Sequence, residues 1–296
     1  MKFGIVEDPT KVDLSLPPDH PDTKVVLNKN KNNNKPKLYV GHPNWKVPRV
    51  LLTKSSTKDE LEYYSRQFNS IELNATFYRL FPKEQFDKWY DKVPADFRFF
   101  PKITRNISHL KRLIDASELI PEYLDHTSLL KEKLGCVFLQ MHNDFQPKNW
   151  DRVEQFIEAW PREVPLAIEF RHTDWFNEPA VSEKLYHLLE ENNISNVLVD
   201  TAGRRDIVHM RMTSNEAFIR FVGANHPSDY YRLDAWVDRL EQWLDAGLQQ
   251  IDFFIHQNIE KESPLLATHF IKQMNDRLGF KLTIPNQDKN NPTLDL

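Results

Sequence analysis

Short hydrophobic runs alternate with longer amphipathic segments along the chain. Eight of the short runs have the length and the β-branched or aromatic content of strands: 38–41, 69–75, 97–103, 135–141, 165–170, 196–200, 217–222 and 251–256. The segments between them place hydrophobic residues three or four positions apart, as in Leu266, Phe270, Met274 and Leu278. Strands that alternate with helices predict a parallel sheet covered by helices.

The number of strands favours a (β/α)₈ TIM barrel, with eight parallel strands in one closed sheet, over residues 37–284. The stretch 201–214 is too short and irregular for a full helix, so we expect the sixth helix to be short or irregular. A doubly wound open sheet is the alternative fold. It is disfavoured because no glycine-rich phosphate-binding motif follows any strand, and the chain has only 7 glycines.

Both ends of the chain differ from this pattern. Residues 1–36 are rich in proline and end in the polar run 28–35, which has too little hydrophobic surface to offset the entropy lost on ordering. We therefore predict an N-terminal arm or linker that is partly flexible. Residues 285–296 are expected to form a flexible tail.

Polar side chains recur with one phase on the predicted strands. In 69–75, Glu72 and Asn74 share one face, while Ile71 and Leu73 share the other. Barrel strands are normally hydrophobic on both faces, because helices cover one and the packed lumen fills the other. The polar face is therefore expected to point into the lumen.

The same phase places further polar residues near the C-terminal ends of other strands, where the active sites of barrels are built. These residues are Lys102, Gln140, Glu169, Arg171, Asp200, Arg220 and His256. The predicted cluster balances three cations against the carboxylates of Glu72, Glu169 and Asp200, as a partly enclosed site requires. Mutual ion pairing that only holds the strand ends together is the alternative interpretation.

The composition narrows the classes of function. A net charge of −4 gives no general field for attracting polyanions, so nucleic-acid binding is not expected. The single cysteine, Cys136, lies in a hydrophobic run and is expected to be a buried side chain. A chain that cannot form an internal disulfide fits a reducing compartment. The sequence has neither a run of about 18 hydrophobic residues nor a signal-peptide pattern at its start, so we expect a cytoplasmic protein.

Several ordered blocks resemble the domain of unknown function 72 family (DUF72, YecE-like). The blocks are 68–78, 97–102 with 107–109, 167–172 with 175–176, 198–201 and 218–223. The resemblance spans roughly residues 37–280 and implies a barrel fold without supplying a reaction. The chain departs from the family pattern at His42-Pro43 before Trp45, and at 256–258, where the family has an Asn-rich turn.

Three chemistries fit the predicted cluster. Glu72 and Glu169 are candidates for acid–base catalysis on a sugar-like substrate, against which Trp45, Tyr78, Trp175 and Tyr231 could stack. An anionic substrate such as a phosphosugar would be held by Lys102, Arg171, Arg220 and the loop 222–226. A desolvated Lys102 could form a Schiff base, although pairing with a carboxylate is the favoured role. A divalent metal held by Glu72, His142, Glu169, Asp200 and His256 is a weaker hypothesis.

Two further classes remain open: a non-catalytic barrel that binds a small ligand, and a nucleic-acid-processing barrel using the basic positions in 102–105 and 111–112. We favour an enzyme, a hydrolase, lyase or isomerase, acting on a small polar or anionic molecule with no required cofactor. The predicted catalytic residues are Glu72, Glu169 and Lys102. The predicted substrate-binding residues are Asn74, Tyr78, Gln140, Arg171, Trp175, Asp200, Arg220, Tyr231 and His256.

Overall fold

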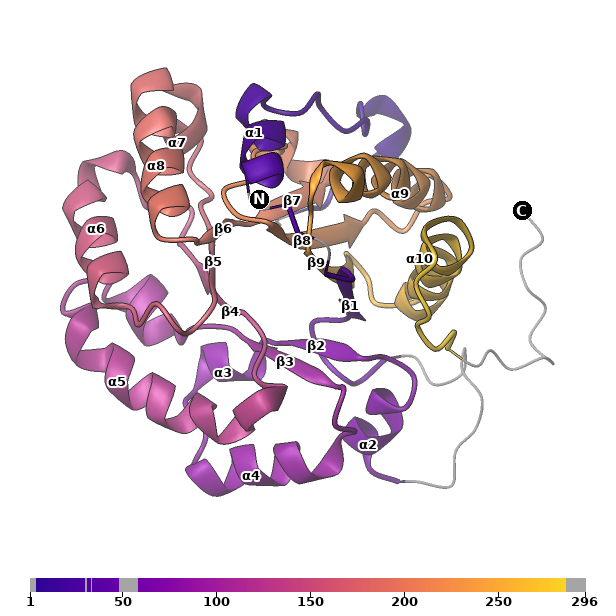
Figure 1. Cartoon of the computed structure of the whole chain (residues 1–296), viewed down its shortest axis with the longest axis horizontal. Coiled ribbons are helices and arrows are strands. Elements are labelled where there is room, and N and C mark those ends of the chain that lie inside the picture. The colour runs from indigo at the N-terminus through magenta and orange to yellow at the C-terminus, as the bar shows by residue number, and fades with distance from the viewer. Residues whose placement is uncertain (1–3, 30, 33, 48–57, 286–296) are drawn as a thin grey trace.

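The computed structural model describes residues 4–29, 31–32, 34–47 and 58–285. Its strands are β1 (Lys37–Gly41), β2 (Ser70–Leu73), β3 (Arg98–Pro101), β4 (Val137–Gln140), β5 (Leu166–Glu169), β6 (Ser195–Asn196), β7 (Leu198–Thr201), β8 (Glu216–Gly223) and β9 (Gln250–Gln257). All the strand pairs between them are parallel. Figure 1 shows the strands following one another around the centre of the molecule, with helices outside them.

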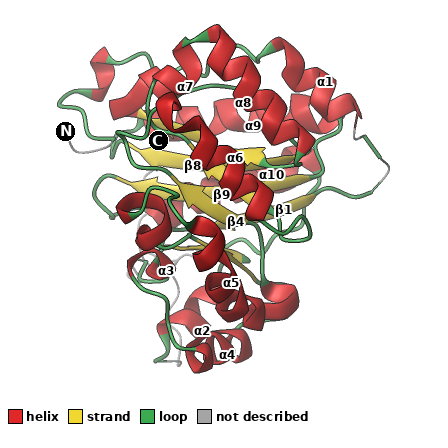
Figure 2. Ribbon diagram, turned by 90° about the vertical axis from the view of Figure 1, so that its left-hand side faces the viewer, coloured by secondary structure: helices red, strands yellow, loops and turns green. Residues whose placement is uncertain are grey.

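The helices occupy the segments between strands, as the hydrophobic spacing predicts. They are α1 (Pro21–Lys29), α2 (Glu60–Ser65), α3 (Ala75–Tyr78), α4 (Lys83–Lys92), α5 (Ala116–Thr127), α6 (Trp150–Ala159), α7 (Asp174–Asn177), α8 (Pro179–Glu191), α9 (Ser228–Ala246) and α10 (Ser263–Leu278). Shorter turns are η1 (Pro9–Lys11), the π-helical η3 (Asn106–Leu110), η4 (Ser128–Lys133), η5 (Pro147–Asn149) and η6 (Ala202–Ile207). In the side view of Figure 2 the strands lie in the middle with helices on either side.

The strand pairing differs from the expected single closed sheet. The strands form three sheets, ordered β1-β9-β8-β7, β2-β3 and β4-β5-β6. The predicted sixth strand breaks at Val197, because β6 pairs with β5 whereas β7 pairs with β8. The expected irregular sixth helix is confirmed, since the connection from β7 to β8 holds only the 3₁₀ turn η6.

Hydrophobic side chains pack in two layers. The larger outer core lies between strands and helices and includes Phe253 with Phe270 of α10, whose rings stack with centroids 4.0 Å apart. A smaller inner core faces the centre of the strands: Phe100, Cys136, Phe138, Ala167, Val197, Val199, Phe218 and Phe254. These aromatic rings contact each other edge-on or tilted, as Phe100 does with Phe254 at 5.0 Å. They form a hydrophobic base beneath the polar ends of the strands.

The N-terminal segment packs against the rest of the molecule. Leu27 of α1 is fully buried in the outer core, and the Asp19 carboxylate accepts a hydrogen bond from Trp243 Nε1 at 2.9 Å. The polar run predicted as a linker therefore begins inside a helix. The tail predicted as flexible lies outside the described residues from position 286 onward.

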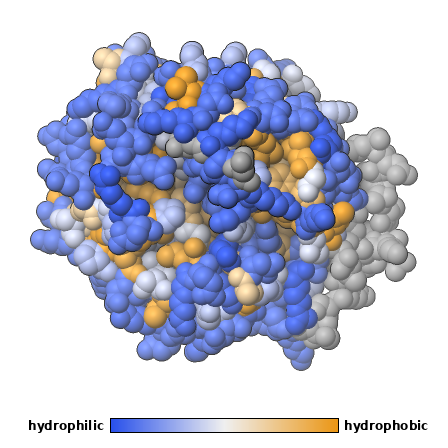
Figure 3. All heavy atoms as spheres, viewed as in Figure 1, coloured by the Kyte–Doolittle hydropathy of each residue, from blue (hydrophilic) through white to orange (hydrophobic). Residues whose placement is uncertain are grey.

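On the face drawn in Figure 3, hydrophilic residues dominate the rim and hydrophobic residues appear mostly nearer the middle. Within the described part of the chain, no helix combines the length and hydrophobicity needed to cross a membrane.

Candidate functional site

A buried ion cluster lies on the inner core. Arg220 of β8 donates from Nε and Nη2 to the two carboxylate oxygens of Glu72, at 2.9 and 2.8 Å, and from Nη1 to Glu169 Oε2 at 2.6 Å. Glu72 and Glu169 have no exposed surface, and Arg220 is 6% exposed. One guanidinium thus joins carboxylates from β2 and β5, which are 97 positions apart in the chain.

The strand phase explains this convergence. Side chains two positions apart lie on the same face of a strand, so Arg220 follows Phe218 of the inner core and Glu169 follows Ala167. Lys102, Gln140 and His256 follow inner-core phenylalanines in the same way. For these strands the predicted inward phase is confirmed.

Four more predicted residues complete the cluster. Gln140 Nε2 donates to both oxygens of Glu169 at 3.1 Å, and its Oε1 accepts a hydrogen bond from Lys102 Nζ at 2.7 Å. Arg171 also pairs with Glu169. The far carboxylate, Glu72, contacts His256 Nε2 at 3.0 Å.

Asn74, directly after β2, donates from Nδ2 to Glu72 Oε1 at 2.7 Å. Its amide also reaches the carbonyl of Pro43 at 3.2 Å. Asn74 therefore ties the buried carboxylate to the loop after β1, and its predicted role in substrate binding stays a prediction.

Both glutamates are held in the ionised form. Burial opposes ionisation of Glu72, but Arg220 and His256 outweigh it and hold the pKa of Glu72 well below its usual range. Burial also opposes ionisation of Glu169, but Arg171, Arg220 and Lys102 lower its pKa to about 2. A carboxylate that stays ionised near neutral pH cannot donate a proton, so neither glutamate suits the expected role of general acid.

Lys102 has the opposite character. Burial, followed by the nearby positive charge of Arg220, lowers the pKa of Lys102 to about 7. No described carboxylate lies within ion-pair distance of Nζ, so the favoured pairing of Lys102 with a carboxylate was wrong. Its positive charge is only partly compensated.

A cavity of about 200 Å³ opens beside the cluster. It is lined by Ile5, Arg171, Arg220, Val222, His256, Gln257 and Asn258. Two guanidinium groups and the ring of His256 reach it, and no carboxylate is among these lining residues. Ile5 belongs to the N-terminal segment, which is fixed there by a hydrogen bond from Asn258 Nδ2 to the Gly4 carbonyl at 2.9 Å.

Asp200 does not join the cluster. The inner core contains Val197 and Val199, so Asp200 faces outward, where Trp236 Nε1 donates to its Oδ2 at 2.9 Å. Its Oδ1 pairs with Arg232 of α9 at 2.9 Å. The predicted inward phase of this strand was wrong, because its polar residue contacts a helix and the inner core takes the valines on the other face.

The predicted aromatic residues do not gather at the cavity either. Trp175 is fully buried in the outer core and donates from Nε1 to the carbonyl of Phe145 at 2.6 Å. Tyr78 and Tyr231 are 66% and 74% exposed, and neither lines the cavity beside the cluster. Trp45 packs edge-on against Trp89 with centroids 5.8 Å apart.

The candidate list omitted His109, which lies next to the cluster. It belongs to η3, and its ring meets Phe77 at 4.8 Å and His142 at 5.3 Å. Burial and the positive charge of Lys102 lower the pKa of His109 to about 4, so this ring is neutral. The signal was present in the Ile107-Ser108-His109 block of the family resemblance.

The segment that follows η3 is strained. Arg112, Leu113 and Asp115 have positive φ angles of 50°, 65° and 52°. Non-glycine residues with such angles are uncommon and are often found near functional sites.

Across the described ranges, no group of three or more His, Cys, Asp or Glu side chains is arranged to hold a metal ion.

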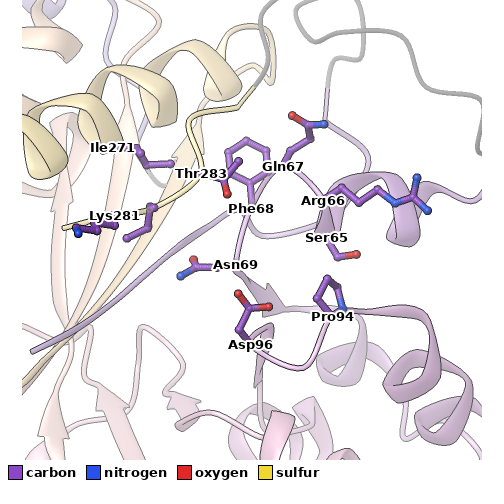
Figure 4. Close-up of a pocket in the computed structure, with 11 residues that line it drawn as sticks. Ser65, Arg66, Gln67, Phe68, Asn69, Pro94, Asp96, Ile271, Lys281 and Thr283 are labelled. Carbon is purple, nitrogen blue, oxygen red and sulfur yellow. The ribbon is translucent and has the colours of Figure 1, made fainter. Parts of the chain in front are cut away.

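A second cavity, of about 360 Å³, lies at the opposite ends of the strands (Figure 4). It is lined by residues that precede β2 and β3, including Arg66 and Asp96, and by Lys281 and Thr283 after α10. Arg66 is exposed and pairs with Glu62 one helical turn earlier. None of the ion-cluster residues lines it.

Acidification is expected to destabilise the protein through the two buried glutamates. Their pKa values are lowered on folding, so their contribution is present above the unfolded value of about 4.5 and is lost as the pH falls toward about 2. The loss should be on the order of a few kcal/mol and can be measured from urea unfolding at a series of pH values. Replacing the half-buried Glu62, whose ion pair with Arg66 lies at the surface, by glutamine should change this acid limb little. Unfolding that is independent of pH in this window would contradict the ionised state of the cluster.

Comparisons with known proteins agree with the resemblance. The model of the family described as "Protein of unknown function DUF72" matches residues 39–290. The chain is 28% identical to the UPF0759 protein YecE of Escherichia coli (strain K12) over 249 residues, covering 78% of this chain and 90% of that protein. It is 25% identical to the UPF0759 protein YunF of Bacillus subtilis (strain 168) over 204 residues, or 64% and 71% of the two chains. In fold it resembles a crystal structure of a DUF72 family protein from Enterococcus faecalis V583, with a TM-score of 0.65 and 20% identity, over 81% of this chain and 98% of that one.

Proposed function

We propose that this chain, which belongs to the DUF72 family of proteins of unknown function, is an enzyme that binds a small anionic molecule beside the ion cluster. The proposed reaction is acid–base chemistry on a sugar- or phosphosugar-like compound. As part of this proposal, the three sheets are neighbours in one (β/α)₈ barrel. In support, the hydrogen bond from Glu72 N to the His42 carbonyl, at 3.0 Å, connects β2 with the end of β1, and a parallel bridge between Lys102 and Phe138 connects the end of β3 with β4.

The observation that carries this proposal is the charge of the cavity wall. Arg171 and Arg220 both line the cavity of about 200 Å³, whose lining residues include no carboxylate. Guanidinium groups bind phosphate and carboxylate oxygens through paired hydrogen bonds. A volume of this size suits a compact ligand, below the range of drug-sized pockets.

His256 is the acid–base group in this proposal. Its ring lines the cavity, and its Nε2 contacts the ionised carboxylate of Glu72 at 3.0 Å. A carboxylate behind an imidazole fixes the orientation of the ring and stabilises the imidazolium that forms when the ring accepts a proton. Glu72 and Glu169 then act as fixed counter-charges, with Gln140 and Asn74 holding them in place.

Replacing Arg171 by glutamine is expected to weaken phosphate binding by roughly tenfold to a hundredfold, because one charge-assisted contact is lost. Inorganic phosphate and a hexose phosphate should raise the Tm of the native protein, and the uncharged hexose should not. Arg66→Gln is the matched control, since this arginine lines the cavity at the other end of the strands. Equal stabilisation by the charged and uncharged sugars would contradict the anionic ligand.

The alternative is a binding protein without catalysis, which the complete pairing of both glutamates favours. NMR of the hexose phosphate incubated with the protein separates the two functions. Conversion that disappears in His256→Asn while phosphate binding persists supports the enzyme.

We also propose a cytoplasmic location, supported by the buried free thiol of Cys136.

A further inference from the structure

We propose that Lys102 is a nucleophilic amine that forms a Schiff base with the carbonyl group of an anionic substrate. This inference rests on the anion site proposed above and names its substrate class: a small oxo acid, or a carbonyl compound that carries a phosphate. The amine and the anion site are separate observations, so they can fail separately.

The surroundings of Lys102 are those of an amine that is buried without a counter-charge in contact. Its Nζ donates to the neutral amide oxygen of Gln140 at 2.7 Å and lies 4.3 Å from the centre of the Phe77 ring. The residue is 6% exposed. Gln140 cannot turn its oxygen away freely, because its Nε2 is bound to Glu169. The amine is thus held in one direction by a partner that does not require it to be charged.

Lys133 shows what a structural buried lysine looks like in the same protein. It is equally buried at 6% exposure, but its Nζ donates to two backbone carbonyls, those of Tyr90 at 2.7 Å and Val93 at 2.8 Å. Those carbonyls accept two of the three ammonium hydrogens. Lys102 has no such carbonyl cage among its described hydrogen bonds.

The protonation equilibrium of Lys102 favours the nucleophilic, neutral form more than that of an ordinary lysine does. Burial, then the charge of Arg220, lowers the pKa of Lys102 to about 7, so a substantial fraction of the amine is neutral at neutral pH. Desolvation and a neighbouring cation are the two means by which enzymes activate Schiff-base lysines. Both act on this residue.

The amine also lies beside the anion site. Lys102 Nζ and Arg220 Cζ face the same ring, at 5.7 and 5.4 Å from the centre of Phe138. A hydrogen-bonded path through Gln140 and Glu169 joins the two cations. Lys102 itself is not among the residues that line the cavity of about 200 Å³, so the proposed substrate extends from the guanidinium groups past Arg220 to bring its carbonyl group to the amine.

The reaction balances without a further reactant. The lone pair of neutral Nζ attacks the carbonyl carbon, the C–N bond forms, and the carbonyl π electrons move to oxygen. A proton passes from the nitrogen to that oxygen and gives a neutral carbinolamine. A second proton, taken from solvent, lets the hydroxyl leave as water, and the nitrogen lone pair forms the C=N bond of the protonated imine. The positive imine nitrogen then withdraws electrons from the adjacent carbon, which favours release of a proton or cleavage of a bond there.

Reductive trapping tests the proposal. The whole protein is incubated with pyruvate and sodium cyanoborohydride near pH 7, and the modified lysines are located by peptide mass spectrometry. We expect Lys102 to be labelled about tenfold faster than Lys133 or the exposed Lys11, because burial and Arg220 lower its pKa to about 7 and the anion site lies beside it. The rate should rise from about pH 6 to about pH 8 as the amine loses its proton. Acetone replaces pyruvate in a parallel reaction, since it has the carbonyl group without the charge.

Each outcome decides one part. Labelling at Lys102 that falls to the acetone rate in Arg171→Gln supports the Schiff base and the anion site together. Equal labelling by pyruvate and acetone keeps the amine chemistry and overturns the anionic substrate class. Labelling at Lys102 no faster than at Lys133 or Lys11, in a protein that phosphate still stabilises, overturns the Schiff base and leaves the anion site intact. Lys102→Arg, which keeps the charge, must abolish the adduct on that peptide.

Discussion

Replacing Arg220 by methionine is expected to lower the free energy of unfolding by roughly 3–5 kcal/mol. The substitution leaves two carboxylates, on Glu72 and Glu169, in a region where neither has any exposed surface. Removing one partner of a buried ion pair costs far more than an exposed pair contributes. Urea unfolding monitored by circular dichroism measures the difference.

The effect should have a characteristic pH dependence. In the native protein the two glutamates contribute stability above pH of about 4.5, because their pKa values are lowered. In the variant, loss of Arg220 raises both pKa values relative to the native protein, although Arg171 and His256 still contact the two carboxylates, so the variant loses less stability on acidification. The difference between the two proteins should therefore shrink as the pH falls. Arg66→Met, which removes an exposed ion pair, should cost about 0.5 kcal/mol or less at any pH.

Replacing Asp200 by leucine is expected to cost roughly 3–5 kcal/mol as well. Its carboxylate is fully buried and receives Arg232 and the indole Nε1 of Trp236. The substitution leaves a buried guanidinium with one carboxylate fewer and an indole N–H without its acceptor, so thermal unfolding should begin at a lower temperature.

This variant also separates the structural role of Asp200 from the substrate-positioning role that the sequence suggests. Phosphate should still stabilise Asp200→Leu by the same increment as it stabilises the native protein, because the carboxylate faces α9. Loss of phosphate binding with unchanged stability would support the sequence-based role. Asp206→Leu is the control, since that aspartate is half-exposed and pairs with Arg204 in the same connection.

The protein holds two sets of buried ions, so a balance of charges along the sequence was not enough to define the site. Both sets of buried ions satisfy the requirement that a buried charge be paired. One set, around Arg220, borders a cavity that two arginines and no carboxylate line. The other, around Asp200, joins β7 to α9 and serves the packing of the outer layer.

Hydrophobic periodicity by itself determined the order of strands and helices and most of the strand phase. Glu72, Glu169 and Arg220 could be assigned to one cluster because side chains alternate along a strand and the ends of parallel strands meet. The family resemblance could likewise be recognised from ordered blocks of residues, and the matching family model confirms it. These features depend on residues that are close together in the chain, so the sequence alone can predict them.

The tertiary structure alone decided which charges meet and what state they are in. Val197 and Val199 and their neighbour Leu198 are all hydrophobic, so the sequence could not tell which face of that strand pointed inward. The sequence predicted Trp175 as a substrate-binding residue at the rim, whereas the structure packs it in the outer core. The low pKa of Glu169 and the near-neutral pKa of Lys102 depend on burial and on charges from four different strands. Such fields act through space between residues far apart in the chain, and no spacing along the sequence records them.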